Sequence, residues 1–288
     1  MTWRARPRRC RCAARARSTG TSQEHTMDRN HLQISYEGAV ARITLTQPEI
    51  RNAFSDEVIA ELTAAFIEAG GRADIRAVVL AARGPAFCAG ANLNWMRRVA
   101  DYTRDESLAD AARLAEMLRV IHECPQPTLA RVQGDVYAGG MGLVAACDIA
   151  VAVDTAGFCL SEVRLGLIPA TISPYVIRAI GARAAHRYFL TAERFGAAEA
   201  LRIGLVHEVV SAQALDAKVD ALLAALTSAG PGAARACKKL LRDVAGRAID
   251  EHLIAATVQG IAEIRASSEG KEGVQSFLNK RKPAWLQG

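Results

Sequence analysis

A glycine-rich segment between two apolar runs is the first candidate for chemistry. Gly139 and Gly140 lie between residues 127–132, which are mostly apolar, and residues 143–147, which are all apolar and indicate a buried helix. The glycines are therefore expected at a helix N-terminus, where backbone N–H groups are free and the helix dipole is positive. Because glycine has no Cβ, a ligand can approach these groups closely. The segment predicts a site that stabilises an oxyanion.

A second loop of similar character lies upstream. Residues 83–96 contain Gly90, follow the apolar run 77–80 and lead into residues that can form a short helix. Each of the two loops thus joins a strand to a helix start. If one backbone N–H group from each loop points at the same oxygen atom, the pair forms a two-pronged oxyanion hole.

Glu162 is the candidate acid/base. It lies in the run 158–168, which is apolar except for Ser161, Glu162 and Arg164. Apolar surroundings raise the pKa of a carboxyl group toward the range that suits proton transfer. On the residues alone, an ordinary ion pair with Arg164 is the stronger interpretation.

A dinucleotide site is the competing interpretation of the glycines. Gly140, Gly142 and Ala145 satisfy the pattern G-x-G-x-x-G/A, and Glu162 follows 22 residues after Gly140. In that fingerprint the first glycine directly follows its strand. Here residues 133–139 separate Gly140 from the predicted strand, which argues against a dinucleotide.

The net charge of the chain comes from its N-terminus. Residues 1–26 contain seven Arg and one Glu, which together carry the formal charge of +6 of the whole 288-residue chain. Removing them from the 36 basic and 30 acidic side chains leaves 29 of each. A charge-balanced body does not favour a nucleic-acid partner. No run of 18 apolar residues occurs, so a membrane-spanning protein is not expected.

Residues 1–26 form an Arg-rich leader that we expect to be disordered. The leader has no apolar core, which excludes a secretory signal, whereas a mitochondrial transit peptide shares its composition. Pro7 and the cluster of residues 8–11 interrupt an amphipathic helix. This favours translation from Met27, with the leader as an upstream extension. We expect a cytoplasmic protein, or a mitochondrial matrix protein if the leader is a transit peptide.

Neither cysteines nor histidines form a ligand pattern. The seven cysteines include no Cys-x-x-Cys pair, and none of the six histidines falls in a motif. Cys88, Cys147, Cys159 and Cys237 have largely apolar or small neighbours, which predicts reduced thiols in a reducing compartment. We expect no metal and no resident cofactor.

Apolar periodicity predicts alternating strands and helices, as in a parallel α/β fold. The predicted strands are residues 32–36, 40–45, 75–81, 127–132 and 149–153. The predicted helices are residues 55–69, 103–123, 143–147, 173–181, 182–190, 197–202, 214–228, 233–244 and 249–266. Thr103 and Glu106 have capping-box spacing. The charged residues 97–105 lack a face for the core.

The motifs resemble those of the enoyl-CoA hydratase/isomerase (crotonase) superfamily. Residues 87–93, 134–148 and 158–169 carry the resemblance, with the tail 277–285. It implies an α/β fold, a spiral of ββα units. It also implies a core with the acyl-CoA site over residues 27–210, and a helical C-terminal region over 211–288 that packs on neighbouring subunits in trimers or dimers of trimers.

The resemblance also implies residue roles. The oxyanion donors would be the backbone N–H groups of Ala91 and Gly139, and Glu162 would be the catalytic acid/base. Coenzyme A would enter as part of the substrate, with Arg51 and Lys280 near its phosphates, although ordinary solvated charges are the alternative for both. The implied substrate and CoA contacts are Arg51, Ala53, Ala89, Ala91, Asn92, Leu93, Asn94, Gly139, Gly142 and Lys280.

One position departs from the common hydratase pattern. Those enzymes carry a second glutamate three residues after the oxyanion glycine, and that position is Gly142 here. Hydration then needs Glu162 for both proton transfers, or another group such as Asp135, Tyr137 or a carboxylate of the substrate. A single glutamate also suits a 3-to-2 enoyl-CoA isomerase.

The amino-acid sequences of residues 89–96 and 158–174 resemble those of bacterial methylglutaconyl-CoA and isohexenylglutaconyl-CoA hydratases. This favours hydration of a branched enoyl-CoA, as in leucine degradation. Asn92 stands where the family usually has Asp and can cap the next helix in the same way. A non-catalytic protein that binds acyl-CoA or RNA is the alternative from another class.

Overall fold

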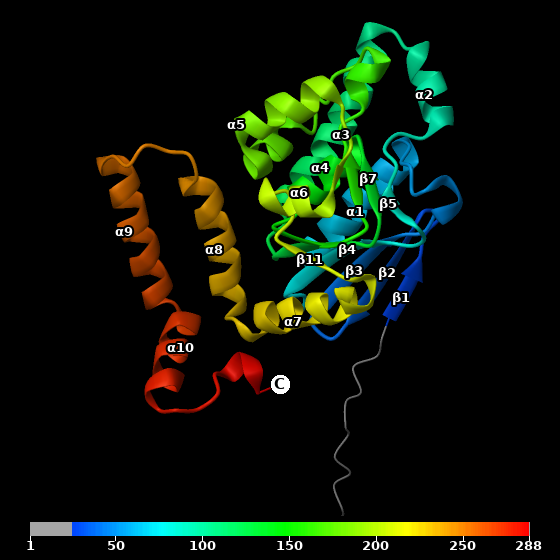
Figure 1. Ribbon diagram of the computed structural model, residues 1–288. Helices are drawn as coiled ribbons and strands as arrows, with labels where there is room; N and C mark the ends of the chain where they lie inside the picture. Colours follow the sequence, from blue (N-terminus) through cyan, green and yellow to red (C-terminus); the bar gives the residue numbers. More distant parts are fainter. Residues whose placement is uncertain (1–24, 288) are drawn as a thin grey trace, which may run out of the picture.

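The computed structural model describes residues 25–287 as two β-sheets with helices around them (Figure 1). His25 and Thr26, which fall within the expected leader, already belong to the first strand. The rest of the leader, residues 1–24, lies outside the described residues. No helix within residues 25–287 has the length and apolar character needed to cross a membrane.

Seven strands form the larger sheet, and their order in space is β1-β2-β3-β4-β6-β8-β11. The β1/β2 and β2/β3 pairs are antiparallel and the other neighbours are parallel. All six residues of β4 are apolar and buried, because a central parallel strand is covered on both faces. The strands are β1 (His25–Asp28), β2 (Leu32–Glu37), β3 (Val40–Leu45), β4 (Ala77–Ala82), β6 (Thr128–Val132), β8 (Ile149–Val153) and β11 (Glu208–Val210).

Four short strands form the second sheet, in the order β10-β9-β7-β5. The strands β5 (Ala86–Cys88), β7 (Asp135–Tyr137) and β9 (Gly157–Cys159) are parallel, and β10 (Phe195–Gly196) is antiparallel to β9. Three times along the chain, a strand of the larger sheet is followed by a strand of the smaller one. Helices follow each of these strand pairs, and this repetition confirms the predicted α/β spiral of ββα units.

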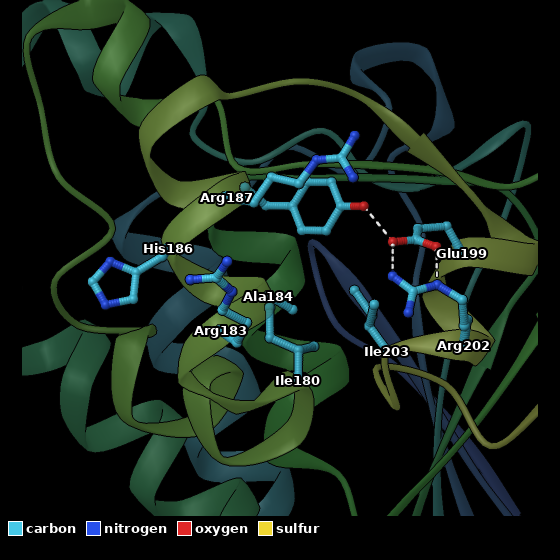
Figure 2. Close-up of a pocket in the computed structure, with 9 residues that line it drawn as sticks. Ile180, Arg183, Ala184, His186, Arg187, Glu199, Arg202 and Ile203 are labelled. Carbon is cyan, nitrogen blue, oxygen red and sulfur yellow. Dashed lines mark hydrogen bonds and ion pairs between the residues drawn. The ribbon is translucent and has the colours of Figure 1, made fainter.

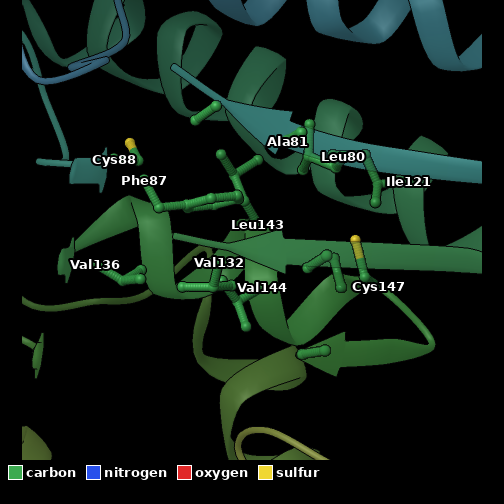
Figure 3. Close-up of a cluster of buried hydrophobic side chains, with 14 of the residues drawn as sticks. Leu80, Ala81, Phe87, Cys88, Ile121, Val132, Val136, Leu143, Val144 and Cys147 are labelled. Atoms are coloured by element: carbon green, nitrogen blue, oxygen red, sulfur yellow. The ribbon is translucent and has the colours of Figure 1, made fainter. Parts of the chain in front are cut away.

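The two sheets share one apolar core around α4 (Gly139–Ala146). Phe87 of β5, Val136 of β7 and Leu80 of β4 gather with Leu143 of α4 in a single buried cluster (Figure 3). All four are completely buried. The core therefore fixes α4 relative to both sheets.

The helices of the body begin and end at recognisable signals. The helix α3 (Arg104–Glu123) opens with the predicted capping box, in which Thr103 and Glu106 each bond the other's backbone. The helix α5 (Ser173–Thr191) is kinked at Gly181, which has φ 74° and ψ 157°, so the two predicted helices meet at this glycine. The other helices are α1 (Asp56–Gly71), α2 (Leu93–Ala100) and α6 (Ala197–Arg202).

The C-terminal region has two parts. The helix α7 (Leu215–Ser228) packs on β4, β6 and β8 and so belongs to the body. The helices α8 (Pro231–Val244), α9 (Glu251–Ala266) and α10 (Ser268–Leu278) form an arm, in which α8 bonds to the body and α9 and α10 stand away from it (Figure 1). An ion pair between buried Lys238 and half-buried Asp148 anchors the arm, with Lys238 Nζ 2.6 Å from Asp148 Oδ2.

The strands and helices predicted from apolar periodicity were confirmed where the periodic segments were long. Periodicity gave no signal for β5, β7 and β9, because three residues are too few to show a period. The first turn of α4 was also missed, since Gly139 and Gly140 have low helix propensity. Residues 97–100, expected only as a charged segment, belong to α2.

Candidate active site

The three segments singled out from the sequence meet at one edge of the smaller sheet. The strands β5, β7 and β9 are parallel neighbours, so their carboxyl ends lie side by side. Ala91 follows β5, Gly139 follows β7 and Glu162 follows β9, each within three residues of its strand. Ligands of α/β proteins bind at such carboxyl edges. The structure therefore brings together the two predicted donors and the predicted acid/base.

The first donor is held by a parallel bridge between Phe54 and Ala91. Phe54 N donates to Gly90 O (2.9 Å) and Asn92 N donates to Phe54 O (3.0 Å). In this pattern the intervening residue turns its own N–H to the opposite side. The N–H group of Ala91 thus points away from Phe54, and no hydrogen bond found among residues 25–287 uses it.

The second donor is the first residue of α4. Gly139 has no acceptor four residues earlier within the helix, so its N–H group is free. The preceding residue, Ala138, has φ 47° and ψ −122°, and its N–H donates to Cys159 O (2.9 Å). A non-glycine residue in this conformation costs about 1–3 kcal/mol and persists because its surroundings hold it. This bond to the end of β9 holds the start of α4 next to the segment that carries Glu162.

The glycines allow the loops to pack on one another. A Cβ on Gly139 would lie 2.3 Å from Cζ of Phe54, and a Cβ on Gly140 would lie 2.9 Å from Cβ of Cys88. A Cβ on Gly90 would lie 3.0 Å from Cβ of Ala138. From the sequence we expected Gly139 and Gly140 to admit a ligand. The structure shows that the space of the missing Cβ atoms is filled by the opposite loop.

The carboxyl group of Glu162 is half-buried, and among residues 25–287 no other residue pairs with it. Burial raises the pKa of this carboxyl above its usual value of 4.5, although a bond from its own backbone N–H opposes the shift. Its Oε2 is inaccessible and has no hydrogen-bond partner. Among the described residues Arg164 forms no ion pair with it, which removes the alternative interpretation.

Five of the predicted CoA contacts lie along one pair of strand-like segments. They are Arg51, Ala53, Ala89, Ala91 and Asn92. Ala89 N donates to Arg51 O (3.0 Å), next to the bridge at Ala91. The structure therefore brings this group together.

Asn52 positions this group and was missed in the sequence. It is 2% exposed and has φ 53°. Its Oδ1 accepts from Gln47 N (3.0 Å), and its Nδ2 donates to Arg83 O (2.8 Å) and Ala86 O (2.9 Å). These bonds fasten the loop that carries Arg51 to the loop before β5. Asparagine tolerates the left-handed conformation, and this was the one available signal.

Asn92 caps α2, as predicted. Its Oδ1 accepts from Asn94 N (2.8 Å) and Trp95 N (3.3 Å). Leu93 and Asn94 are exposed beside it. Trp95 is buried, and its ring centroid lies 6.2 Å from that of Phe54. The start of α2 is thus held by its cap Asn92 and by the contact of Trp95 with Phe54, the residue that forms the bridge to Ala91.

Gly142 and Lys280 do not join the site as the sequence suggested. Gly142 is covered by Ile172 and Leu118, so it offers no surface to a ligand. Lys280 follows α10, in the tail that Arg76 holds through a bond from Nη1 to Trp285 O (3.2 Å). Arg76 precedes β4, whereas the site follows the carboxyl ends of the strands, about 17 Å away along a six-residue strand. Within one chain, Lys280 therefore does not reach Arg51.

Contacts in the structure bear on two other interpretations of the sequence, namely Asp135 as a second acid and the dinucleotide fingerprint. Asp135, one candidate for a second acid, opens β7 at the amino edge and binds Gly157 N (2.8 Å) and Arg194 Nη2 (2.9 Å). The argument against a dinucleotide site rested on the residues that separate β6 from Gly140, and the strand β7 lies within that gap. The fingerprint fails for a different reason, because Gly140 and Gly142 lie inside α4 with their Cα atoms covered.

A separate cavity of about 640 Å³ lies between α5 and α6 (Figure 2). Two of the arginines that line it are already paired, Arg187 with Glu193 and Arg202 with Glu199, at 2.6 Å each. Tyr188 also donates to Glu199. The cavity holds none of the three segments described above. Among residues 25–287 no group of three His, Cys, Asp or Glu side chains is placed to hold a metal ion.

Comparison with known proteins agrees with this geometry. Residues 35–288 match the family model described as enoyl-CoA hydratase/isomerase. The enoyl-CoA hydratase ACTT6 of Alternaria alternata is 32% identical over 260 residues, which are 90% of this chain and 85% of the relative.

Two solved structures are also similar. An enoyl-CoA hydratase from Shewanella pealeana superposes with a TM-score of 0.87 and 41% identity, over 89% of this chain and 96% of that one. Pseudomonas aeruginosa AtuE superposes with a TM-score of 0.86 and 35% identity, over 90% and 100%. The chain belongs to the enoyl-CoA hydratase/isomerase (crotonase) family.

Proposed function

We propose that the protein is an enoyl-CoA hydratase that adds water across the 2,3 double bond of an acyl-CoA thioester. The observation that carries the proposal is the half-buried carboxyl group of Glu162, whose inaccessible Oε2 has no partner, at the same sheet edge as the free backbone N–H groups of Ala91 and Gly139. A carboxyl group in such surroundings can exchange protons near neutral pH. Two N–H groups can hold the oxygen on which negative charge develops.

The reaction runs through the thioester oxygen. The carboxylate of Glu162 takes a proton from water while the water oxygen bonds to the β-carbon. The electron pair of the double bond moves through the α-carbon to the thioester oxygen, where the N–H groups of Ala91 and Gly139 stabilise the enolate. When the carbonyl re-forms, protonated Glu162 returns its proton to the α-carbon. Water is thus added without any group beyond this chain and its substrate.

The proposed substrate is a branched enoyl-CoA such as 3-methylglutaconyl-CoA. The similarity of residues 89–96 and 158–174 to hydratases of that type supports it. The test is to incubate the purified protein with 3-methylglutaconyl-CoA and with crotonyl-CoA and to follow the absorbance of the conjugated thioester. Loss of absorbance with either supports a hydratase, and no change with both would refute it.

A 3-to-2 enoyl-CoA isomerase is the second candidate, and Gly142 favours it. An isomerase needs one base, which removes a proton from one carbon and returns it to another. A 3-enoyl-CoA would then gain conjugation in H₂¹⁸O without taking up the label. A labelled 3-hydroxyacyl product formed from a 2-enoyl-CoA would instead identify the hydratase.

We also propose that the protein works as a homotrimer or a dimer of trimers assembled through the arm. The arm carries large exposed apolar side chains, among them Ile249, Val258 and Phe277 at 85%, 60% and 81% exposure. Since Lys280 does not reach Arg51 in its own chain, a neighbouring copy is the proposed source of a Lys280 near the CoA phosphates. Light scattering after size-exclusion chromatography tests the assembly, and a monomer at micromolar concentration would refute it.

A further inference from the structure

A cavity of about 310 Å³ lies at the end of α4 opposite to Gly139. It is lined by residues of α3, α4, α5 and β8 and of the segment between α6 and β11. Because α4 has eight residues, the cavity lies about 10 Å along the helix axis from Gly139, so it is separate from the candidate active site. Its volume is at the lower end of the range for pockets that bind small molecules, about 300–1,000 Å³. Its polar lining residues are His122, Asp148, Tyr175, Arg178 and His207.

His207 lines the cavity in a fixed position. Its Nδ1 accepts from Ala150 N (3.1 Å), and its own backbone N donates to Ala150 O (2.8 Å). A ring nitrogen that accepts a hydrogen bond carries no proton, so the proton of the neutral ring is on Nε2. Among residues 25–287 no acceptor bonds this Nε2. His207 therefore offers the cavity one N–H donor.

Tyr175 and Arg178 lie one turn apart on α5 and supply further donors. Neither the hydroxyl of Tyr175 nor the guanidinium of Arg178 has a hydrogen-bond or ion-pair partner in the part of the chain that the structure describes. Side chains at positions i and i+3 face the same side of a helix. The Tyr175 ring also packs edge-on against the ring of His122, with the centroids 5.4 Å apart. Donors from two separate segments thus line the same cavity.

The charges around the cavity favour an anion. The carboxylate of Asp148 is paired with Lys238 Nζ at 2.6 Å, so its charge is compensated within the chain. Burial lowers the pKa of His122 below its usual value of 6.5. The positive charges of Lys238 and Arg178 lower this pKa further, and Asp148 opposes them. His122 is therefore neutral at pH 7, and the positive charge of Arg178 remains uncompensated.

The rest of the lining is mostly apolar and includes Val144, Ala145, Ala179 and Leu205. We propose that the cavity binds a small organic carboxylate, whose oxygens are held by Arg178, Tyr175 and His207 while its carbon chain packs on the apolar wall. A guanidinium group suits this ligand because it can bond both oxygens of a carboxylate. The proposal goes beyond the hydratase activity and does not depend on it.

Isothermal titration calorimetry of the full-length protein tests the proposal. The probes are isobutyrate, a small branched monocarboxylate, and inorganic phosphate, an oxyanion without a carbon chain, in a chloride buffer of constant ionic strength. Wild type should bind isobutyrate with a Kd of about 1 mM or below. It should bind phosphate more weakly, because phosphate leaves the apolar wall uncovered.

Variants on α5 locate the binding. Arg178→Met keeps an apolar stem and removes the charge, and it should weaken isobutyrate binding about tenfold or more, as loss of a hydrogen bond to a charged group does. Tyr175→Phe removes only the hydroxyl and should weaken binding about threefold. Arg183→Met is the matched control and should leave Kd unchanged, because Arg183 is an exposed arginine of the same helix that lines the other cavity (Figure 2).

Two further measurements separate this cavity from the candidate active site. Glu162→Gln should leave the Kd for isobutyrate unchanged, and Arg178→Met should leave the turnover of enoyl-CoA unchanged. If no acyl-CoA is turned over while binding that depends on Arg178 is observed, the proposed function is refuted and this site stands.

Four results would overturn the proposed carboxylate site. They are a Kd for isobutyrate that is equal in wild type and Arg178→Met, a Kd weakened as much by Glu162→Gln or Arg183→Met as by Arg178→Met, tighter binding of phosphate than of isobutyrate, and neither heat nor a rise in Tm with isobutyrate well above the expected Kd.

Discussion

The tip of the Phe54 ring lies against Cα of Gly139, so that a Cβ at position 139 would stand 2.3 Å from Cζ. The same Phe54 forms the bridge that orients Ala91. One residue thus touches both proposed oxyanion donors. The spacing of the two N–H groups depends on this contact.

Gly139→Ala should therefore reduce activity strongly. The added methyl group has to displace the Phe54 ring or the start of α4, and either shift moves a donor away from the thioester oxygen. Loss of one oxyanion donor costs about 10²–10³ in kcat. Steady-state kinetics measure the effect, and Phe54→Leu combined with Gly139→Ala should recover part of it. A variant as active as wild type would show that Gly139 is not a donor.

Glu162→Gln should abolish proton transfer while leaving the fold intact. We expect kcat to fall about 10²–10⁴-fold because the amide can neither take up nor release the proton. Glu251→Gln in the first turn of α9 is the control and should retain full activity. Undiminished turnover by Glu162→Gln would return the protein to the class of non-catalytic acyl-CoA binders.

The raised pKa of Glu162 should be visible in both catalysis and stability. As a base the carboxyl acts when ionised, so kcat/KM should rise with pH through one ionisation above the usual value of 4.5. Burial disfavours the ionised form, so its contribution to stability is present below pH 4.5 and is lost as pH rises through the raised pKa.

Glu162→Gln should consequently be more stable than wild type at neutral pH, and the difference should vanish in acid. Urea unfolding at several pH values measures this difference. A difference that grows as the pH falls would mean that the pKa of Glu162 is lowered.

Asn52→Ala should loosen the loop that carries Arg51, a proposed CoA contact. The change removes three hydrogen bonds at a buried site and puts alanine in a left-handed conformation, which together costs roughly 2–4 kcal/mol. Asn52→Gly keeps the backbone conformation accessible and isolates the hydrogen bonds. Urea unfolding and KM for the acyl-CoA should both change, and an unaffected KM would separate Asn52 from the site.

Lys238→Met should weaken the attachment of the arm. Removing one partner of the ion pair leaves the half-buried carboxylate of Asp148 without its cation, although it keeps its bonds from Thr128, and the cost is about 1–3 kcal/mol. Lys239→Met is the matched control on the same helix. Its pair with Asp243 is exposed, and it should change the free energy of unfolding by less than about 1 kcal/mol. Equal effects of the two changes would contradict the buried anchor.

Sequence reasoning succeeded where an inference depends on local order along the chain. The capping box at Thr103, the cap at Asn92 and the glycine at 181 act within a few residues, so their residue types determine their geometry. Apolar periodicity likewise indicated the α/β class. The motifs around Ala91, Gly139 and Glu162 indicated the family.

The sequence alone determined which groups are available for chemistry, namely two glycine loops and one glutamate, and which glutamate is missing at Gly142. Only the tertiary structure decided that Ile172 fills the space above Gly142, that Asn52 fastens the loop carrying Arg51 and that Lys280 lies away from Arg51. The reason is physical. These contacts join residues 30 or more positions apart, and the packing of three short parallel strands, none long enough to show a period, places them.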